Sequence, residues 1–126
     1  MRTPNGQFPE YHTSADNLDF VQPSLLAESF EVGVSILHLL ENNGTYINQN
    51  PKCEPQLGKR GLYRALGGVE SRVDELAMLW VLNLSDGNHS LLQISEKSDL
   101  PFPVILNAAR ILCEHELLQE MRSQHQ

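Results

Sequence analysis

The first candidate for chemistry is a histidine near the start of the chain. His12 lies in the stretch FPEYHTSADNLDF (residues 8–20), after Tyr11 and before Asp16 and Asp19. Imidazole nitrogens and carboxylate oxygens are ligands that zinc takes in proteins, so this stretch indicates part of a metal site. A catalytic zinc needs about three protein ligands and an open position, which the stretch alone does not supply. His12 is our one candidate metal ligand; the alternative is a loop histidine bonded to Asp16 or to the backbone.

The cysteines and the remaining histidines form no second site by spacing. Cys53 and Cys113 are far apart in the sequence, so we expect two free thiols. No local histidine is placed to activate Cys53 as a nucleophile. The other four histidines show no ligand spacing either: His38, His89, His115 and His125.

A locally basic loop follows the first predicted helix. Lys52, Lys59, Arg60 and Arg64 fall within a glycine-rich and proline-containing segment, residues 45–68. Such a loop can hold a carboxylate or phosphate of a substrate, or dock on an acidic partner surface. The alternative is a connector whose charges face water, and the sequence leaves both interpretations open.

The overall charge argues against a nucleic-acid partner. The 126 residues carry a formal charge of -7. Residues 1–70 hold five Lys/Arg and eight Asp/Glu (-3), and residues 71–126 hold four and eight (-4). Neither half is built to meet a polyanion. We find no apolar run near the roughly 20 residues of a membrane span and no signal peptide at the N-terminus, which favours a cytoplasmic protein without a membrane partner.

A long apolar helix is the main predicted element of the first half. Residues 1–23 are expected to be loop, with one short extended piece near residues 8–12. From Ser24 to Asn42 the apolar residues cover well over half of a helix surface, so we expect this helix to be nearly buried. Two stripes make up that surface: Leu26, Phe30, Gly33, Leu37 and Leu40, and Leu25, Val32, Ile36 and Leu39.

The second half reads as three short helices. After a connector over residues 45–68, with a turn of helix near 62–66 and a hinge at Gly67-Gly68, a helix is predicted from Ser71 to about Asp86. Ser90 and Gln93 form a capping box for a second helix to Lys97. A third helix is expected from Phe102 or Pro103 to His115. The predicted inward residues are Val73, Leu76, Ala77, Trp80, Leu84, Ile105, Ala108, Ala109 and Leu112.

The tight turn between the second and third helices is typical of a helix-turn-helix. Leu117 and Leu118 stand where a winged helix begins its first wing strand, and Glu116 stands where many winged helices have a glycine. The third helix offers only Asn107 and Arg110 to read DNA bases. We therefore expect a structural or protein-interaction winged helix rather than a DNA-binding one.

Three stretches resemble a known family. FPEYHTSADNLDFV (residues 8–21), followed by an apolar helix, resembles the end of the catalytic domain of two-zinc aminopeptidases of the bacterial leucyl-aminopeptidase type. PKCEPQLGKRGLYRALGG (51–68) and MLWVLNLSDGNHSLLQISEKSDLPFPVILNAA (78–109) resemble a branch with an aminopeptidase-like domain and a C-terminal winged helix. The resemblance covers nearly the whole chain. It implies that His12 is the last zinc ligand of a site whose other ligands lie upstream.

The other ligands of that family have no match here. We find no His-x-Asp and no Glu-Glu pair in the 126 residues. The resemblance thus implies a C-terminal fragment of a zinc aminopeptidase-like protein that hydrolyses a peptide or amide substrate. Zinc belongs to the full-length parent, and we do not expect it to bind tightly to this chain, which lacks a complete active site.

The expected fold is mainly α. Residues 1–68 would be the tail of an α/β aminopeptidase-like domain plus connector, and residues 69–126 a winged-helix-like three-helix unit. The helix from Ser24 to Asn42 needs a partner, which is either the missing N-terminal peptidase-like domain or a second copy of the chain. The alternative function is a stand-alone helix-turn-helix module that binds nucleic acid or a partner protein.

Overall fold

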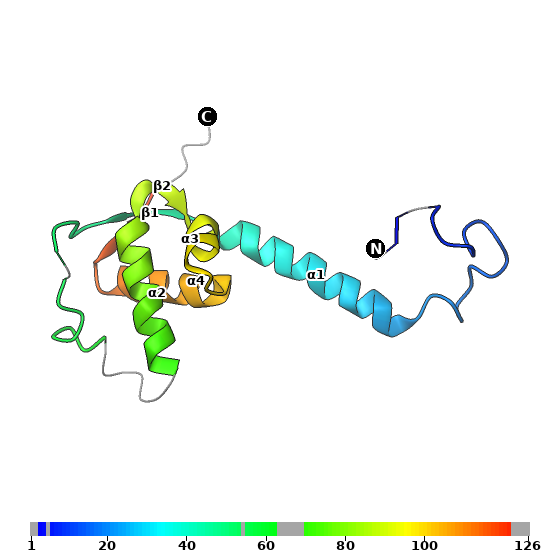
Figure 1. The fold of residues 1–126 in the computed structure, drawn as a ribbon, viewed down its shortest axis with the longest axis horizontal. Helices are drawn as coiled ribbons and strands as arrows, with labels where there is room; N and C mark the ends of the chain where they lie inside the picture. Colours follow the sequence, from blue (N-terminus) through cyan, green and yellow to red (C-terminus); the bar gives the residue numbers. More distant parts are fainter. Residues whose placement is uncertain (1–2, 5, 54, 63–69, 122–126) are drawn as a thin grey trace. The chain divides into compact units, whose positions relative to one another are not determined.

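The computed structural model describes residues 3–4, 6–53, 55–62 and 70–121. The chain divides into two compact units, residues 1–40 and 41–126 (Figure 1). Each unit is described by itself below. Three predictions lie outside the described residues: the turn of helix near residues 62–66, apart from Leu62, the Gly67-Gly68 hinge, and the domain boundary after residue 68.

The first unit consists of a turn-rich loop followed by helix α1. The loop is built from local hydrogen bonds between residues three or four apart, such as Tyr11 N–H to the Phe8 carbonyl (3.2 Å) and Asp16 N–H to the Thr13 carbonyl (3.2 Å). The extended piece expected near residues 8–12 is wrong, because these residues form turns and bends. Helix α1 runs from Pro23 to Asn42 and confirms the predicted helix.

The apolar surface of α1 is exposed within this chain. None of its 20 residues is buried. Nothing in the described structure covers this helix, so the burial that we expect for it requires a partner that the chain does not supply. The exposed large apolar side chains of α1 are Leu25, Leu26, Phe30, Val32, Val34, Ile36, Leu37 and Leu40.

Helix α1 is the element that bears on our expectation of no membrane-spanning segment. Among the described residues it is the one helix long and apolar enough to cross a membrane, judged by length and composition only. An 18-residue window of this helix has a mean hydropathy of 1.2. Glu28, Glu31 and several serines interrupt the apolar run of this helix, so the sequence shows no continuous apolar span here.

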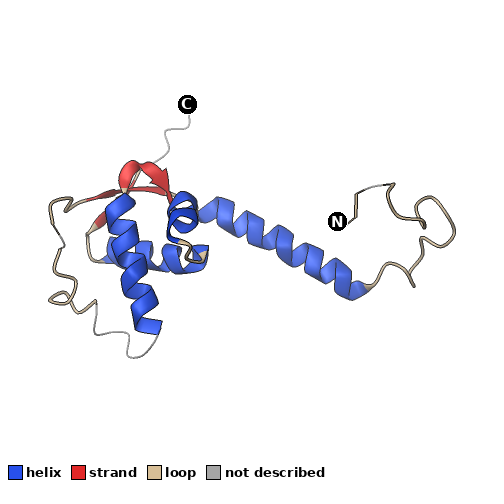
Figure 2. Ribbon diagram, viewed as in Figure 1, coloured by secondary structure: helices blue, strands red, loops and turns tan. Residues whose placement is uncertain are grey.

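The second unit is a small sheet with three helices (Figure 2). Its elements follow the order β1 (Thr45–Asn48), α2 (Glu70–Leu84), β2 (Asp86–Ser90), α3 (Leu91–Ser98), α4 (Phe102–Glu114) and β3 (Leu118–Glu120). The strands form an antiparallel sheet in the order β2-β1-β3. The three predicted helices and the first wing strand are confirmed.

Strand β1 was missed, although it is the central strand. Ile47 pairs with Asp86 on one side and with Gln119 on the other. Four residues are too few for an alternating pattern to be recognised, and Pro51 and several glycines follow within the same segment. The second compact unit accordingly begins at residue 41, ahead of β1.

The core lies between α2, α3 and α4 and under the sheet. Helix α4 buries the predicted residues Ile105, Ala108, Ala109 and Leu112. On α2 the predicted stripe is partly wrong. Of the predicted residues, Ala77 is buried, Trp80 and Leu84 are partly buried, and Val73 and Leu76 are exposed. Met78 and Val81, which were not predicted, are fully buried, whereas Leu79 is exposed.

The helix-turn-helix is fixed by local hydrogen bonds. The predicted capping box is confirmed: Ser90 N–H donates to Gln93 Oε1 (2.9 Å) and Gln93 N–H donates to Ser90 Oγ (3.4 Å). At the other end of α3, Asp99 adopts a left-handed conformation with φ 57° and ends the helix. The Ser95 hydroxyl donates to the Leu100 carbonyl (2.6 Å), which ties the turn back onto α3.

Glu116 occupies the left-handed position that leads from α4 into β3. Its φ is 58°, a conformation that costs residues other than glycine roughly 1–2 kcal/mol. The N–H of Glu116 donates to the Cys113 carbonyl (3.0 Å) and that of Leu117 to the Leu112 carbonyl (2.9 Å). These two bonds define a Schellman motif, in which glycine is the usual residue. The wing strand forms despite the glutamate.

Replacing Glu116 by glycine is therefore expected to stabilise the second unit by about 1 kcal/mol, since glycine adopts this φ without steric cost. Chemical denaturation followed by circular dichroism measures the change. Glu114→Gly is the matched control, because Glu114 lies in the last turn of α4 and glycine there should destabilise by about 0.5–1 kcal/mol. Equal effects of the two substitutions would contradict the argument from backbone conformation.

Candidate functional site

His12 lies on the exposed surface of the first unit. Its backbone is left-handed, with φ 58°, which is uncommon for a residue other than glycine. Its ring stacks on that of Tyr11, with centroids 4.0 Å apart and planes at 17°. Tyr11 in turn lies edge-on to Phe8, at 5.5 Å. The turn therefore presents the imidazole at the surface, beside a small aromatic cluster.

The carboxylates near His12 do not complete a metal site in the described part of the chain. Among the residues that the structure describes, no group of three or more His, Cys, Asp or Glu side chains could hold a metal ion. The side chains that stabilise this loop are those of Thr13 and Asn17. Thr13 Oγ1 donates to the Glu10 carbonyl (2.8 Å), and Asn17 Oδ1 accepts the Asp19 N–H (2.9 Å). Asn17, which the sequence did not single out, thus stabilises this turn.

Helix α4 presents a short polar face to the surface. Its exposed residues are Pro103, Asn107, Arg110 and Glu114. Arg110, the one basic residue on this helix, donates from Nη2 to Asn42 Oδ1 (2.9 Å). Contacts to DNA phosphates and bases come mainly from basic and amide side chains. The exposed face of α4 therefore offers little to a nucleic acid.

Asn42, Asn43 and Gly44 join the start of the second unit to its helices. The Leu92 N–H donates to Asn43 Oδ1 (2.9 Å), and the Leu91 N–H donates to the Gly44 carbonyl (3.0 Å). The first turn of α3 thereby finds acceptors for two of its otherwise unpaired amides. The sequence indicated only a helix stop at Asn43-Gly44, since a bond between residues 49 positions apart leaves no local signal.

A chain of three polar side chains links β2 to α3. His89 Nδ1 lies 3.0 Å from Asp86 Oδ1, and Lys97 Nζ lies 2.7 Å from His89 Nε2. Because the lysine must donate to Nε2, the imidazole is neutral in this arrangement and its Nδ1–H donates to the aspartate. The Asn88 N–H also donates to Asp86 Oδ1 (2.8 Å), and these donors lower the pKa of the Asp86 carboxyl to about 2.

The lowered pKa of Asp86 has a consequence for acid stability. The Asn88 N–H, first, and His89, second, favour the ionised carboxylate in the folded state. The contribution of Asp86 is therefore complete above its ordinary pKa of 3.8 and is lost as the pH falls toward about 2. We expect carbon-detected NMR to give a midpoint near 2 for this carboxyl, and a higher midpoint in the His89→Ala variant. A midpoint near 3.8 in the unmodified chain would contradict the hydrogen-bonding geometry.

The two cysteines are free, as expected, and differ in environment. Cys53 is exposed and has φ 68°, whereas Cys113 is half-buried. Burial, first, and the nearby Glu120 carboxylate, second, raise the pKa of the Cys113 thiol.

In the basic loop, Lys52, Lys59 and Arg60 are exposed, and Arg60 Nε donates to the Pro55 carbonyl (3.2 Å). Arg64 lies outside the described residues.

The sheet, the helix-turn-helix and the wing strand together define a winged helix-turn-helix. A family model with that description matches residues 44–120, which is more than half of the chain. The chain therefore belongs to the winged helix-turn-helix family. A second model, described as a domain of unknown function (DUF4910), matches residues 1–43.

Two relatives from Clostridium acetobutylicum extend this result. One is a curated protein named "Putative polysaccharide biosynthesis protein with aminopeptidase-like domain", which is 52% identical over 113 residues. The match covers 89% of this chain, but this chain spans only 26% of that protein's length. The other is the crystal structure of a "putative peptidase", with 48% identity and a TM-score of 0.79, covering 90% of this chain and 24% of the other.

Proposed function

We propose that this chain acts as one part of a longer, zinc-dependent aminopeptidase-like protein. The observation that carries the proposal is its 52% identity to a protein named for an aminopeptidase-like domain, of which it spans 26%. The exposed apolar surface of α1 is a second support, because such a surface normally marks an interface. In the longer protein we expect hydrolysis of a peptide or amide substrate.

We assign His12 in that protein the role of a zinc ligand. Its imidazole is exposed and can therefore meet ligands from elsewhere in a longer chain. Two bound zinc ions would supply an activated water for hydrolysis, with a glutamate as general base. Among the described residues, no two further ligands lie beside His12, so the described part of this chain does not fit a catalytic zinc.

Helix α1 is expected to be covered by the aminopeptidase-like part or, in the isolated chain, by a second copy. A membrane is the other apolar environment that its length would fit. Glu28 and Glu31 lie inside the helix, and ionised carboxylates within a bilayer are costly. We therefore favour a protein partner for α1 and a cytoplasmic location.

The winged helix is proposed to be a structural or protein-interaction module. Residues 41–126 contain eight Lys/Arg and eleven Asp/Glu, a difference of -3. Arg110 of α4 is hydrogen-bonded to Asn42 rather than free to reach a phosphate. Both observations weigh against a duplex that carries one negative charge about every 1.7 Å along its axis.

A stand-alone nucleic-acid-binding module is the second candidate, since the chain has a helix-turn-helix fold. Gel-shift assays on mixed-sequence duplex DNA at about 50 and about 200 mM salt separate the two candidates. We expect no retained complex at the higher salt. A saturable complex there that weakens in the Arg110→Ala variant would favour the second candidate.

The main proposal is tested by the reading frame and by zinc binding. An in-frame His-x-Asp and a Glu-Glu pair upstream of Met1 are expected, because they would supply the missing ligands and base. A stop codon directly upstream would contradict the proposal. Calorimetry of the isolated chain should show weak zinc binding without peptidase turnover. One tight zinc per chain, lost in His12→Ala, would also contradict it.

A further inference from the structure

We infer that a groove beside α2 binds an extended, uncharged peptide segment by one of its large apolar side chains. We call it the Cys53 groove. It is a cavity of about 350 Å³ within the second unit, a volume in the range of ligand sites. Its walls are Asn48, Pro51, Cys53, Pro55, Leu79, Leu82, Asn83, Ser85 and Asp86.

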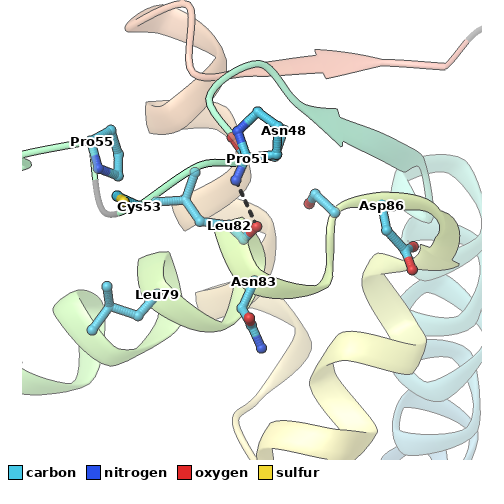
Figure 3. A pocket seen from close by; sticks show the side chains of 9 residues that line it. Asn48, Pro51, Cys53, Pro55, Leu79, Leu82, Asn83 and Asp86 are labelled. Atoms are coloured by element: carbon cyan, nitrogen blue, oxygen red, sulfur yellow. Dashed lines mark hydrogen bonds between the residues drawn. The ribbon is translucent and has the colours of Figure 1, made fainter.

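Two segments distant in sequence form the walls of the Cys53 groove. Figure 3 shows Pro51, Cys53 and Pro55 on the loop that follows β1, and Leu79 and Asn83 on α2. Asn48 Nδ2 donates to the Leu82 carbonyl (2.8 Å), which holds the loop side against the helix. The side chains of the two prolines and Leu79 give the groove an apolar surface.

Polar groups in the groove match a peptide backbone. Asn83 is exposed, and its side-chain amide has no hydrogen-bond partner among the described residues. An amide side chain both donates and accepts, as a peptide group does. Ser85 is 3% exposed, and its hydroxyl is the one buried side-chain oxygen or nitrogen in the described structure that lacks a partner. It lines the same cavity.

The described residues that line the groove do not favour an acidic ligand. No Lys or Arg of the described structure lines it, and Asp86 is the one charged residue among the described residues that do. Asp86 Oδ1 is already engaged by the Asn88 N–H and by His89. A carboxylate or phosphate would therefore meet like charge and no cation in this cavity. The chemistry fits an uncharged segment.

The apolar surface continues beyond the groove along α2. A second, shallower cavity of about 300 Å³ is lined by Leu76, Leu79, Trp80 and Asn83. It shares Leu79 and Asn83 with the first cavity. Leu76 and Leu79 are 46% and 41% exposed. Two depressions that share Leu79 and Asn83 suit an extended chain with successive apolar side chains better than a single small molecule.

The exposed thiol of Cys53 allows a direct test on the full chain by disulfide capture. In the probe, one half of a disulfide is acetyl-leucine joined by an amide bond to 2-mercaptoethylamine. The comparison probe has acetyl-glycine in place of acetyl-leucine. The Cys53 thiolate attacks the probe, forms a mixed disulfide with the amino-acid half and releases the other half as a thiol. Cys113→Ser removes the second thiol, and intact mass in rising 2-mercaptoethanol measures retention.

We expect that reduction of the mixed disulfide with the leucine probe requires about tenfold more 2-mercaptoethanol than reduction of the one with the glycine probe. An apolar side chain in the groove would stabilise the mixed disulfide by about that factor. Leu79→Lys should remove the difference, whereas Leu18→Lys, at an exposed leucine of the loop before α1, should leave it unchanged. Asn83→Ala should weaken retention of the leucine probe but not of an isopentyl disulfide without an amide.

Equal retention of the leucine and glycine probes would overturn the proposal. So would a leucine preference that survives Leu79→Lys, because the side chain would then bind elsewhere. Leu79 is on the surface of α2, so its replacement should leave the unit folded, which circular dichroism checks. Neither result depends on the zinc peptidase assignment.

Discussion

Replacing Phe30 and Leu37 of α1 by lysine is expected to convert the purified chain from a self-associated form to a monomer. Phe30 is 72% exposed and Leu37 61% exposed, and both lie among other exposed apolar side chains of the helix. Each Å² of apolar surface removed from water contributes roughly 25 cal/mol, so a surface of several such residues favours association strongly. Light scattering at several concentrations measures the change in mass.

The control for that experiment keeps the added charge and leaves the apolar surface intact. Ser29 and Ser35 are exposed on the same helix, so Ser29→Lys with Ser35→Lys adds the same two charges. This control should still self-associate. The near-ultraviolet signal of Trp80, in the second unit, should be unchanged in both variants. A clean monomer of the unmodified chain, with α1 protected from hydrogen exchange, would contradict the prediction.

Replacing Met78 by alanine is expected to destabilise the second unit by about 2–5 kcal/mol. Met78 is 1% exposed in the core, and removal of a buried side chain costs its transfer free energy plus that of the cavity left behind. Two positions earlier, Leu76 is 46% exposed, so Leu76→Ala should cost well under 1 kcal/mol. Denaturant unfolding of both variants measures the difference directly.

This pair decides which face of α2 is buried. If Leu76→Ala cost more free energy of unfolding than Met78→Ala, the inward stripe predicted from the sequence would be right. The buried face of α2 in the structure would then be wrong. Trp80 is partly buried, so Trp80→Ala should cost less than the roughly 3–5 kcal/mol of a fully buried aromatic residue. Unfolding should be followed on the whole second unit, because a piece that begins at residue 71 lacks the central strand β1.

The sequence by itself determined the elements whose signals are local. Helix α1 was predicted to within one residue, because its apolar spacing and the Asn43-Gly44 stop lie within one segment. The capping box at Ser90 and Gln93 involves residues three apart, so it too could be recognised without a structure. His12 was singled out by residue type and by family resemblance, and its role stays a proposal.

The tertiary structure decided what depends on distant residues. Strand β1 is stable because Ile47 pairs with Asp86 and Gln119, which lie 39 and 72 positions further along the chain. The buried face of α2 was set by packing against α3 and α4, since apolar residues occur on more than one side of this helix. The Cys53 groove likewise requires a loop and a helix to meet. The local sequence pattern carries no information about such tertiary contacts, because the free energy that selects them comes from the burial of side chains of both segments against each other.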